Sequence, residues 1–244
     1  MKSPEELIAR LLNYLAEKYK NQLILKGGIL LRLLNSPRST QDLDYSWIRT
    51  KKRDVFAKEL KTSLEMLEGI QVTDIRANSR GVFLDIRDST SGNQATIEIS
   101  VEKSLNRPPQ SLTSAVLSNL YSLKPQIIAT MDLSEALSNK IAAALERDLA
   151  RDFYDLMQLE PMTAFDEATL RDRLSRLEIG RSKARKIRPS DASKMLRTKL
   201  DALNEENLRE ELSAFLPKEQ LVGLFQIIRA SVGRLIQRME VLTD

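Results

Sequence analysis

The sequence predicts an α+β protein in which a mixed-sheet lobe, residues 1–131, is followed by an all-helical lobe, residues 132–244. Two patterns predict this division. Short β-branched or alternating runs bounded by turn residues, typical of strands, recur up to about residue 130. From Leu133 onward, apolar residues keep the three- and four-residue spacing of amphipathic helices. A chain of 244 residues is long enough for each lobe to bury its own core.

The first lobe is expected to begin with a helix over residues 5–19, where Ser3 is the N-cap and Pro4 takes the first helical position. Turn residues at Asn78-Ser79 and Ser91-Gly92-Asn93 predict an antiparallel meander between residues 70 and 101. The further expected elements of this lobe are strand 22–25, helix 29–34, strand 42–47, helix 55–67, strands 70–76, 81–86 and 95–101, and a short strand at 126–130.

The second lobe is expected to contain helices only. The first begins at Leu133, and later ones are predicted at 166–178, 190–203, 205–215 and 218–240.

Composition excludes several classes of catalysis. The sequence has no cysteine and no histidine, so nucleophilic cysteines, histidine bases and sites built on thiolate or imidazole are ruled out. Carboxylates, lysine, arginine, hydroxyl groups and hard metal ions remain. No apolar run approaches the roughly 18 residues of a membrane-spanning helix, and acids stand where a signal peptide would be apolar. We therefore expect a cytoplasmic protein without membrane contact.

The positive charge is concentrated in one segment. The chain carries a net charge of +4, whereas residues 171–199 hold eleven Lys and Arg against three acids, a net charge of +8. This excess is typical of a surface for a polyanion or an acidic partner, and it also fits a solvated helix face.

Three features of the first lobe carry candidate chemistry. At Gly27-Gly28, between a strand and a helix, missing Cβ atoms let a phosphate approach backbone N–H groups. Asp42 and Asp44 project from one face of a strand and repel each other unless a cation such as Mg²⁺ lies between them. Glu98 stands between two isoleucines on a later strand. Taken singly, these features also fit a tight turn and solvent-facing acids.

Together, the three features resemble the active-site signature of the DNA polymerase β-like nucleotidyltransferase superfamily in order and spacing. The resemblance implies a glycine loop that holds the triphosphate and a two-metal site at Asp42, Asp44 and Glu98, where the third carboxylate helps to hold the metal that activates the attacking hydroxyl. Two hard cations suit in-line phosphoryl transfer. If Glu98 lay on the opposite sheet face, Asp85 on the neighbouring strand would replace it.

The flanking residues give a closer resemblance, to the AbiEii family of nucleotidyltransferase-like toxins. LKGGILLRLL from Leu25 and RSTQDLDY from Arg38 look like the family's LKGGTALR and R(F/T)SxDLDF. SEALSNKI from Ser134, then Arg147, then RDFYDL from Arg151 are similar to its E-x-L-A-x-K-L, R and RD-x-Y-D-L. The resemblance covers roughly residues 22–160. Ile29 departs from it, because a hydroxyl residue is frequent there.

The family resemblance also implies roles for individual residues. Lys26, Gly27, Gly28 and Lys140 would bind the nucleotide, since lysine suits a polyphosphate as a flexible point charge. Asp152 would be catalytic near the same site, whereas Arg151 and Asp155 would be structural, with a local Arg151–Asp152 ion pair as the alternative. Lys140 is expected to be exposed, so Lys140→Ala is predicted to leave the fold intact.

The resulting hypothesis is a Mg²⁺-dependent nucleotidyltransferase toxin of a toxin-antitoxin or abortive-infection system. It would transfer a nucleotidyl group from an NTP to RNA, with tRNA as the implied acceptor, and block translation. A cognate antitoxin is the implied partner, and segment 171–199 would contact RNA or that antitoxin. The alternatives are phosphate or nucleotidyl transfer to a protein or small molecule, and a catalytically idle nucleotide-binding module.

Overall fold

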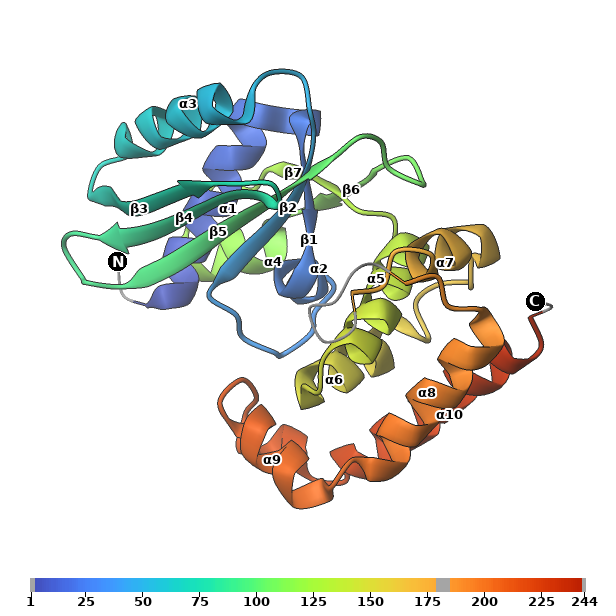
Figure 1. Ribbon diagram of the computed structural model, residues 1–244. Coiled ribbons are helices and arrows are strands. Elements are labelled where there is room, and N and C mark those ends of the chain that lie inside the picture. Colours follow the sequence, from blue (N-terminus) through green and yellow to red (C-terminus); the bar gives the residue numbers. More distant parts are fainter. Residues whose placement is uncertain (1–2, 179–184, 243–244) are drawn as a thin grey trace. The chain divides into compact units, whose positions relative to one another are not determined.

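The computed structural model describes residues 3–178 and 185–242 (Figure 1). The chain divides into two compact units, Met1–Met131 and Asp132–Asp244. The first holds all the strands that the structure describes, and helices make up the regular structure of the second. The predicted α+β class is therefore confirmed.

The first unit is built on a seven-stranded mixed sheet in the order β3-β4-β5-β2-β1-β7-β6. Neighbouring strands are antiparallel except for the parallel pairs β2–β5 and β1–β7. The expected meander of β3, β4 and β5 is present. The strands are β1 Leu23–Lys26, β2 Asp42–Ile48, β3 Ile70–Ala77, β4 Gly81–Asp88, β5 Gln94–Glu102, β6 Gln110–Thr113 and β7 Ile127–Thr130.

The helices of this unit are α1 Pro4–Tyr19, α2 Gly27–Leu33, α3 Arg53–Glu65 and α4 Ala115–Ser118, with short 3₁₀ turns η1 Lys20–Gln22 and η2 Asn119–Tyr121. The Ser3 hydroxyl accepts a hydrogen bond from the Glu6 N–H at 3.2 Å and caps α1 as predicted. Sequence reasoning missed β6 and α4, because Gln110–Thr113 is a short polar edge strand and Ala115–Ser118 is a single turn. Neither is long enough to show periodicity.

The hydrophobic core lies on one face of the sheet. Alternate residues of β1, β2, β4 and β5 pack there against the apolar stripe of α1 and against α3. Trp47 stacks on Phe56 of α3 at 4.1 Å between ring centroids, and Tyr19 meets the same ring edge-on at 5.8 Å. The residues that alternate with them on these strands therefore point to the other face of the sheet.

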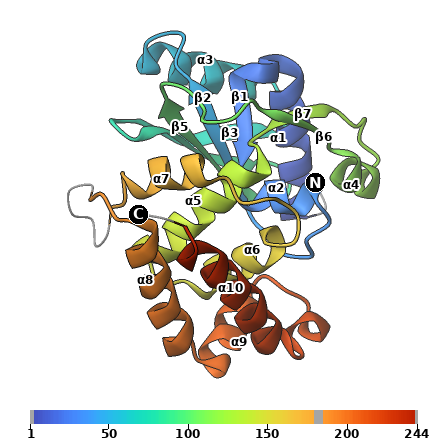
Figure 2. The same ribbon diagram turned by 90° about the vertical axis from the view of Figure 1, so that its right-hand side faces the viewer.

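The second unit contains the helices α5 Leu133–Glu146, α6 Ala150–Leu159, α7 Glu167–Leu174, α8 Pro189–Ala202, α9 Glu205–Ser213 and α10 Leu224–Glu240, with a 3₁₀ turn η4 at Lys218–Leu221. Helices α8 and α10 pack side by side (Figures 1 and 2). The helix predicted over 218–240 is interrupted because Gly223 adopts a φ of 69°. Among the described residues, no helix is long and apolar enough to cross a membrane.

Candidate active site

The glycine turn after β1 is shaped by two close approaches. Gly27 has a φ of 73°, and a Cβ atom there would lie 2.0 Å from Oδ2 of Asp44. A Cβ atom on Gly28 would lie 2.6 Å from Nη1 of Arg38. Both glycines are therefore required by side chains of the same unit, an aspartate in one case and a buried arginine in the other.

Strand pairing brings three predicted residues into one row across the sheet. Lys26 of β1 lies opposite Asp44 of β2, and Asp44 lies beside Glu98 of β5. Asp42 stands two residues away on the same face of β2, beside Thr96. Directly paired residues project on the same side, so Glu98 lies on the face of the two aspartates. We call Lys26, Asp44 and Glu98 the cross-strand row.

The polar face of β2 is shorter than its alternation predicts. Asp42 is exposed and Asp44 is half-buried, but Ser46, the next residue of the same parity, is fully buried. On neighbouring β5, the Ser100 hydroxyl accepts a hydrogen bond from Nζ of Lys26 at 2.9 Å. The Lys26 ammonium group is therefore held over the face that carries the carboxylates.

The electrostatics of the row favour a cation. Partial desolvation raises the pKa of Glu98 although its side chain is exposed, and the negative charges of Asp44 and Asp42 raise it further. Lys26 and Arg76 act in the opposite direction and lower this pKa only in part. A hard divalent ion would relieve the repulsion between the carboxylates, because its preferred ligands are carboxylate oxygens.

The carboxylates do not form a closed metal cage. In residues 3–178 and 185–242, no group of three acidic side chains is arranged to hold a metal ion. The predicted two-metal site is therefore still a prediction, supported by register and charge. Asp85 faces the same side of the sheet opposite Thr96 and pairs with Arg76 at 3.3 Å. It is not needed as a replacement for Glu98.

In the helical unit, Lys140 belongs to a buried charge cluster. Its Nζ lies 2.6 Å from Oδ2 of Asp155 and 3.8 Å from Oδ1 of Asp152, and both aspartates are fully buried. The guanidinium of Arg147 makes two hydrogen bonds to Asp152, at 2.6 and 2.7 Å. Asp152 is therefore paired with Arg147, and Asp155 is the nearest carboxylate to Lys140.

Two sequence-based expectations about this cluster are wrong. Lys140 is not an exposed lysine, since only 17% of its side chain is accessible and it neutralises buried acid. Asp152 does not pair with Arg151, whose guanidinium lies over the ring of Phe215 at 5.9 Å. In the sequence, Arg147 is only one residue of the family pattern. Its spacing from Asp152 does not mark it, rather than Arg151, as the partner of that aspartate.

The basic segment is largely neutralised where the structure describes it. Several of its arginines and lysines form ion pairs with acids of the helical unit, and residues 179–184 lie outside the described part. The pairs are Arg171–Glu167, Arg173–Glu146, Arg176–Asp172, Arg188–Asp191, Arg197–Glu240 and Lys199–Asp148. The field of this segment is therefore weaker than a count of its charges predicts.

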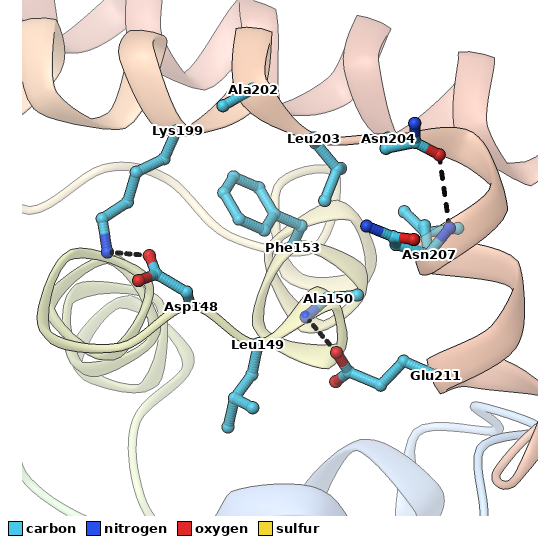
Figure 3. A pocket seen from close by; sticks show the side chains of 11 residues that line it. Asp148, Leu149, Ala150, Phe153, Lys199, Ala202, Leu203, Asn204, Asn207 and Glu211 are labelled. Atoms are coloured by element: carbon cyan, nitrogen blue, oxygen red, sulfur yellow. Dashed lines mark hydrogen bonds and ion pairs between the residues drawn. The ribbon is translucent and has the colours of Figure 1, made fainter.

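A pocket of about 240 Å³ opens between α6, α8 and α9 of the helical unit (Figure 3). Phe153 and Leu203 form its apolar side, and Lys199, paired with Asp148 at 2.7 Å, lies at one end. At the other end, Glu211 accepts hydrogen bonds from the N–H groups of Ala150 and Arg151 at 2.9 and 3.2 Å and so caps α6. No site residue predicted from the sequence lines this pocket.

Comparisons with known proteins identify the family and the fold. Residues 10–228 match the family model described as nucleotidyl transferase AbiEii toxin, type IV toxin-antitoxin system. The fold is similar to MenT4, a nucleotidyltransferase toxin from Mycobacterium tuberculosis H37Rv, with a TM-score of 0.65 and 20% identity over 97% of this chain and 86% of that one. Two Helicobacter pylori structures follow. JHP933 gives a TM-score of 0.50 and 15% identity over 97% and 89% of the two chains. A putative nucleotidyltransferase gives 0.54 and 15% over 99% and 96%. No curated protein sequence matches this chain.

Proposed function

The chain belongs to the AbiEii nucleotidyltransferase toxin family of type IV toxin-antitoxin systems, and we propose that it transfers a nucleotidyl group from an NTP to a hydroxyl group of RNA. In this reaction the RNA oxygen attacks the α-phosphorus, a phosphodiester bond forms and pyrophosphate leaves. The observation that carries the proposal is the cross-strand row of Lys26, Asp44 and Glu98, with Asp42 beside it and the glycine turn at its end.

Each part of the row has a distinct task in this proposal. Asp42, Asp44 and Glu98 would hold divalent metal, which when bound offsets the charge of the phosphates and lowers the pKa of the attacking hydroxyl. Lys26, held over the same face by Ser100, offers its ammonium group to the phosphates. The turn at Gly27-Gly28 would lie beside the triphosphate, because the Asp44 carboxylate packs directly against Gly27.

Lys140 is assigned a phosphate contact in the same proposal. Its ammonium group is placed by Asp155, and its side chain keeps some accessible surface. An ammonium held by a buried carboxylate loses little further side-chain entropy when it meets an anion. Asp152 lies beside Lys140 and is held by Arg147, so in this proposal it is a positioning residue that orients Lys140 for the phosphate.

RNA as the acceptor, with tRNA the family-implied molecule, is supported by the basic residues of segment 171–199. Six of them pair with acids of the same unit. All of these pairs except Arg173–Glu146 have an exposed partner, and exposed ion pairs contribute only about 0–1 kcal/mol each. Phosphates can therefore replace these carboxylates at small cost. Blocked translation would follow from a modified tRNA, and the type IV family implies a cognate antitoxin.

The test is to incubate the protein with each α-labelled NTP, Mg²⁺ and total RNA, and to follow the label into RNA and protein bands. Label in a tRNA band that disappears with EDTA and in Asp44→Asn supports the proposal. The matched control is Asp54→Asn, an exposed acid on α3, which should transfer label normally. Label in protein alone would favour the protein-directed alternative, and no label with any NTP would favour an idle nucleotide-binding module.

A further inference from the structure

The cross-strand row continues beyond Glu98 to an aromatic residue. Phe83 of β4 lies directly opposite Glu98, and Arg76 of β3 lies opposite Phe83. The order across five strands is therefore Lys26, Asp44, Glu98, Phe83 and Arg76. Paired residues project from the same face, so the Phe83 ring stands beside the carboxylates and away from the core.

Packing does not account for an aromatic residue at this position. The residues before and after it, Val82 and Leu84, are fully buried in the core, whereas Phe83 is partly exposed and lies outside the core cluster. Its neighbours on the open face are charged, namely Arg76, Asp85 and Glu98. Within the described residues, no aromatic ring is paired with it.

We propose that the Phe83 ring is the surface on which the terminal base of the RNA acceptor stacks, an inference that rests on the proposed function. On the proposed assignment, Glu98 lies on the side of the attacking hydroxyl. Phe83 is the next residue outward, one strand spacing of about 4.8 Å from Glu98 and two from Asp44. A nucleotide whose hydroxyl is above the carboxylates therefore lays its base over Phe83.

The charges around the ring favour a base over other acceptor groups. Arg76 pairs with Asp74 at 2.8 Å and with Asp85 at 3.3 Å, so its guanidinium is shared by two acids on the sheet face. A phosphate chain running over Asp74 and Asp85 would be repelled, whereas the uncharged face of a base would not. Stacking on an aromatic ring also tolerates every base, which suits an enzyme that recognises the end of an RNA molecule and not its sequence.

The experiment measures binding directly and needs no turnover. A short single-stranded RNA with 2-aminopurine as its 3′-terminal base is titrated with wild-type protein, Phe83→Leu and Phe83→Trp. Stacking quenches the fluorescence of this base, so wild type and Phe83→Trp should quench it. In Phe83→Leu, affinity should fall about 5- to 150-fold and the quenching should be lost. The matched control is Arg87→Ala, an exposed residue of the same parity on β4, which should bind like wild type.

A second RNA that lacks only the terminal base separates stacking from a structural effect. Removal of the base should weaken binding to wild type and leave binding to Phe83→Leu unchanged, so that the two changes are not additive. Additive losses, or equal quenching by wild type and Phe83→Leu, would overturn the inference even if nucleotidyl transfer to RNA is observed. Transfer to a protein acceptor alone would reject the proposed function, and the inference with it.

Discussion

Lys140 and Asp155 form a short ion pair, 2.6 Å between Nζ and Oδ2, in which the aspartate side chain is fully buried and the lysine side chain is 17% accessible. The partly accessible end of this pair is the lysine. The pair therefore combines a structural requirement, neutralisation of buried acid, with a cation available to a ligand.

Lys140→Ala should consequently destabilise the protein by about 3 kcal/mol, because it removes the cation that lies 2.6 Å from the buried Asp155 carboxylate. Urea unfolding at neutral pH measures the loss. The double variant Lys140→Ala with Asp155→Asn should regain part of it, and Lys194→Ala, an exposed lysine of the same unit, should change stability by less than about 0.5 kcal/mol. Equal stability of Lys140→Ala and wild type would show that Asp155 is neutralised by other means.

Asp44→Asn should remove the toxicity expected of the intact protein when it is expressed without its antitoxin. Loss of one charged ligand at the reaction centre should lower the transfer rate by roughly a hundredfold or more, while the repulsion on Glu98 decreases. Growth curves, with soluble protein checked by circular dichroism, provide the measurement. Persistent growth arrest by the folded variant would assign the harm to binding rather than to catalysis.

Gly27→Ala should inactivate the enzyme through Asp44. A left-handed alanine costs about 1–2 kcal/mol, and its Cβ would also displace the Asp44 carboxylate, 2.0 Å away. Gly92→Ala is the matched control, because Gly92 has a φ of 76° and its nearest neighbour is Arg87 Nη2 at 3.9 Å. Both variants should lose the stability that a left-handed alanine costs, Gly27→Ala should lose more because of its contact with Asp44, and only Gly27→Ala should lose nucleotidyl transfer. Retained nucleotidyl transfer in Gly27→Ala would show that the glycine turn is not part of the reaction site.

The Glu98 carboxyl should titrate above its ordinary pKa of 4.5, because of partial desolvation and the charges of Asp44 and Asp42. A raised pKa means that the native state binds this proton more tightly than the unfolded state does, so the contribution of Glu98 to the free energy of unfolding falls as pH rises from about 4.5 through the native pKa. Glu98→Gln should remove this fall, which urea unfolding at pH 4 to 7 would reveal. Carboxyl NMR should show a lower pKa in Asp44→Asn; an unchanged value would exclude repulsion as a cause.

The sequence predicted the elements with long periodic patterns and the residues of the row, but not the contacts made by individual side chains. Alternation at Asp42 to Tyr45 and the two isoleucines around Glu98 were sufficient to assign faces, because the period of a strand is fixed. Pairing of Glu98 with Phe83 depends on the register of the β4–β5 hairpin, which is set by the geometry of its turn and not by the alternation of either strand. Sequence reasoning therefore did not single out Phe83.

The helical cluster shows a second limit. A lysine and two aspartates spaced along two helices look like surface charges in a sequence, since charged residues are seldom buried. Their burial follows from the packing of α5 on α6. The buried position of Arg38 against Gly28 was equally hidden, although the residue stands in a recognised pattern.

The parallel pairing of β2 with β5 has a consequence for biosynthesis. Asp44 and Glu98 are 54 positions apart in the chain, and β3 and β4 lie between their strands in the sequence. Such non-local pairing carries a loop-closure cost that a growing polypeptide meets only after β5 has left the ribosome. A prematurely terminated product that ends before Gln94 would therefore keep Lys26, Asp42 and Asp44 but lack Glu98 and the strand that completes the row. We expect such fragments of incomplete translation to have no transfer activity.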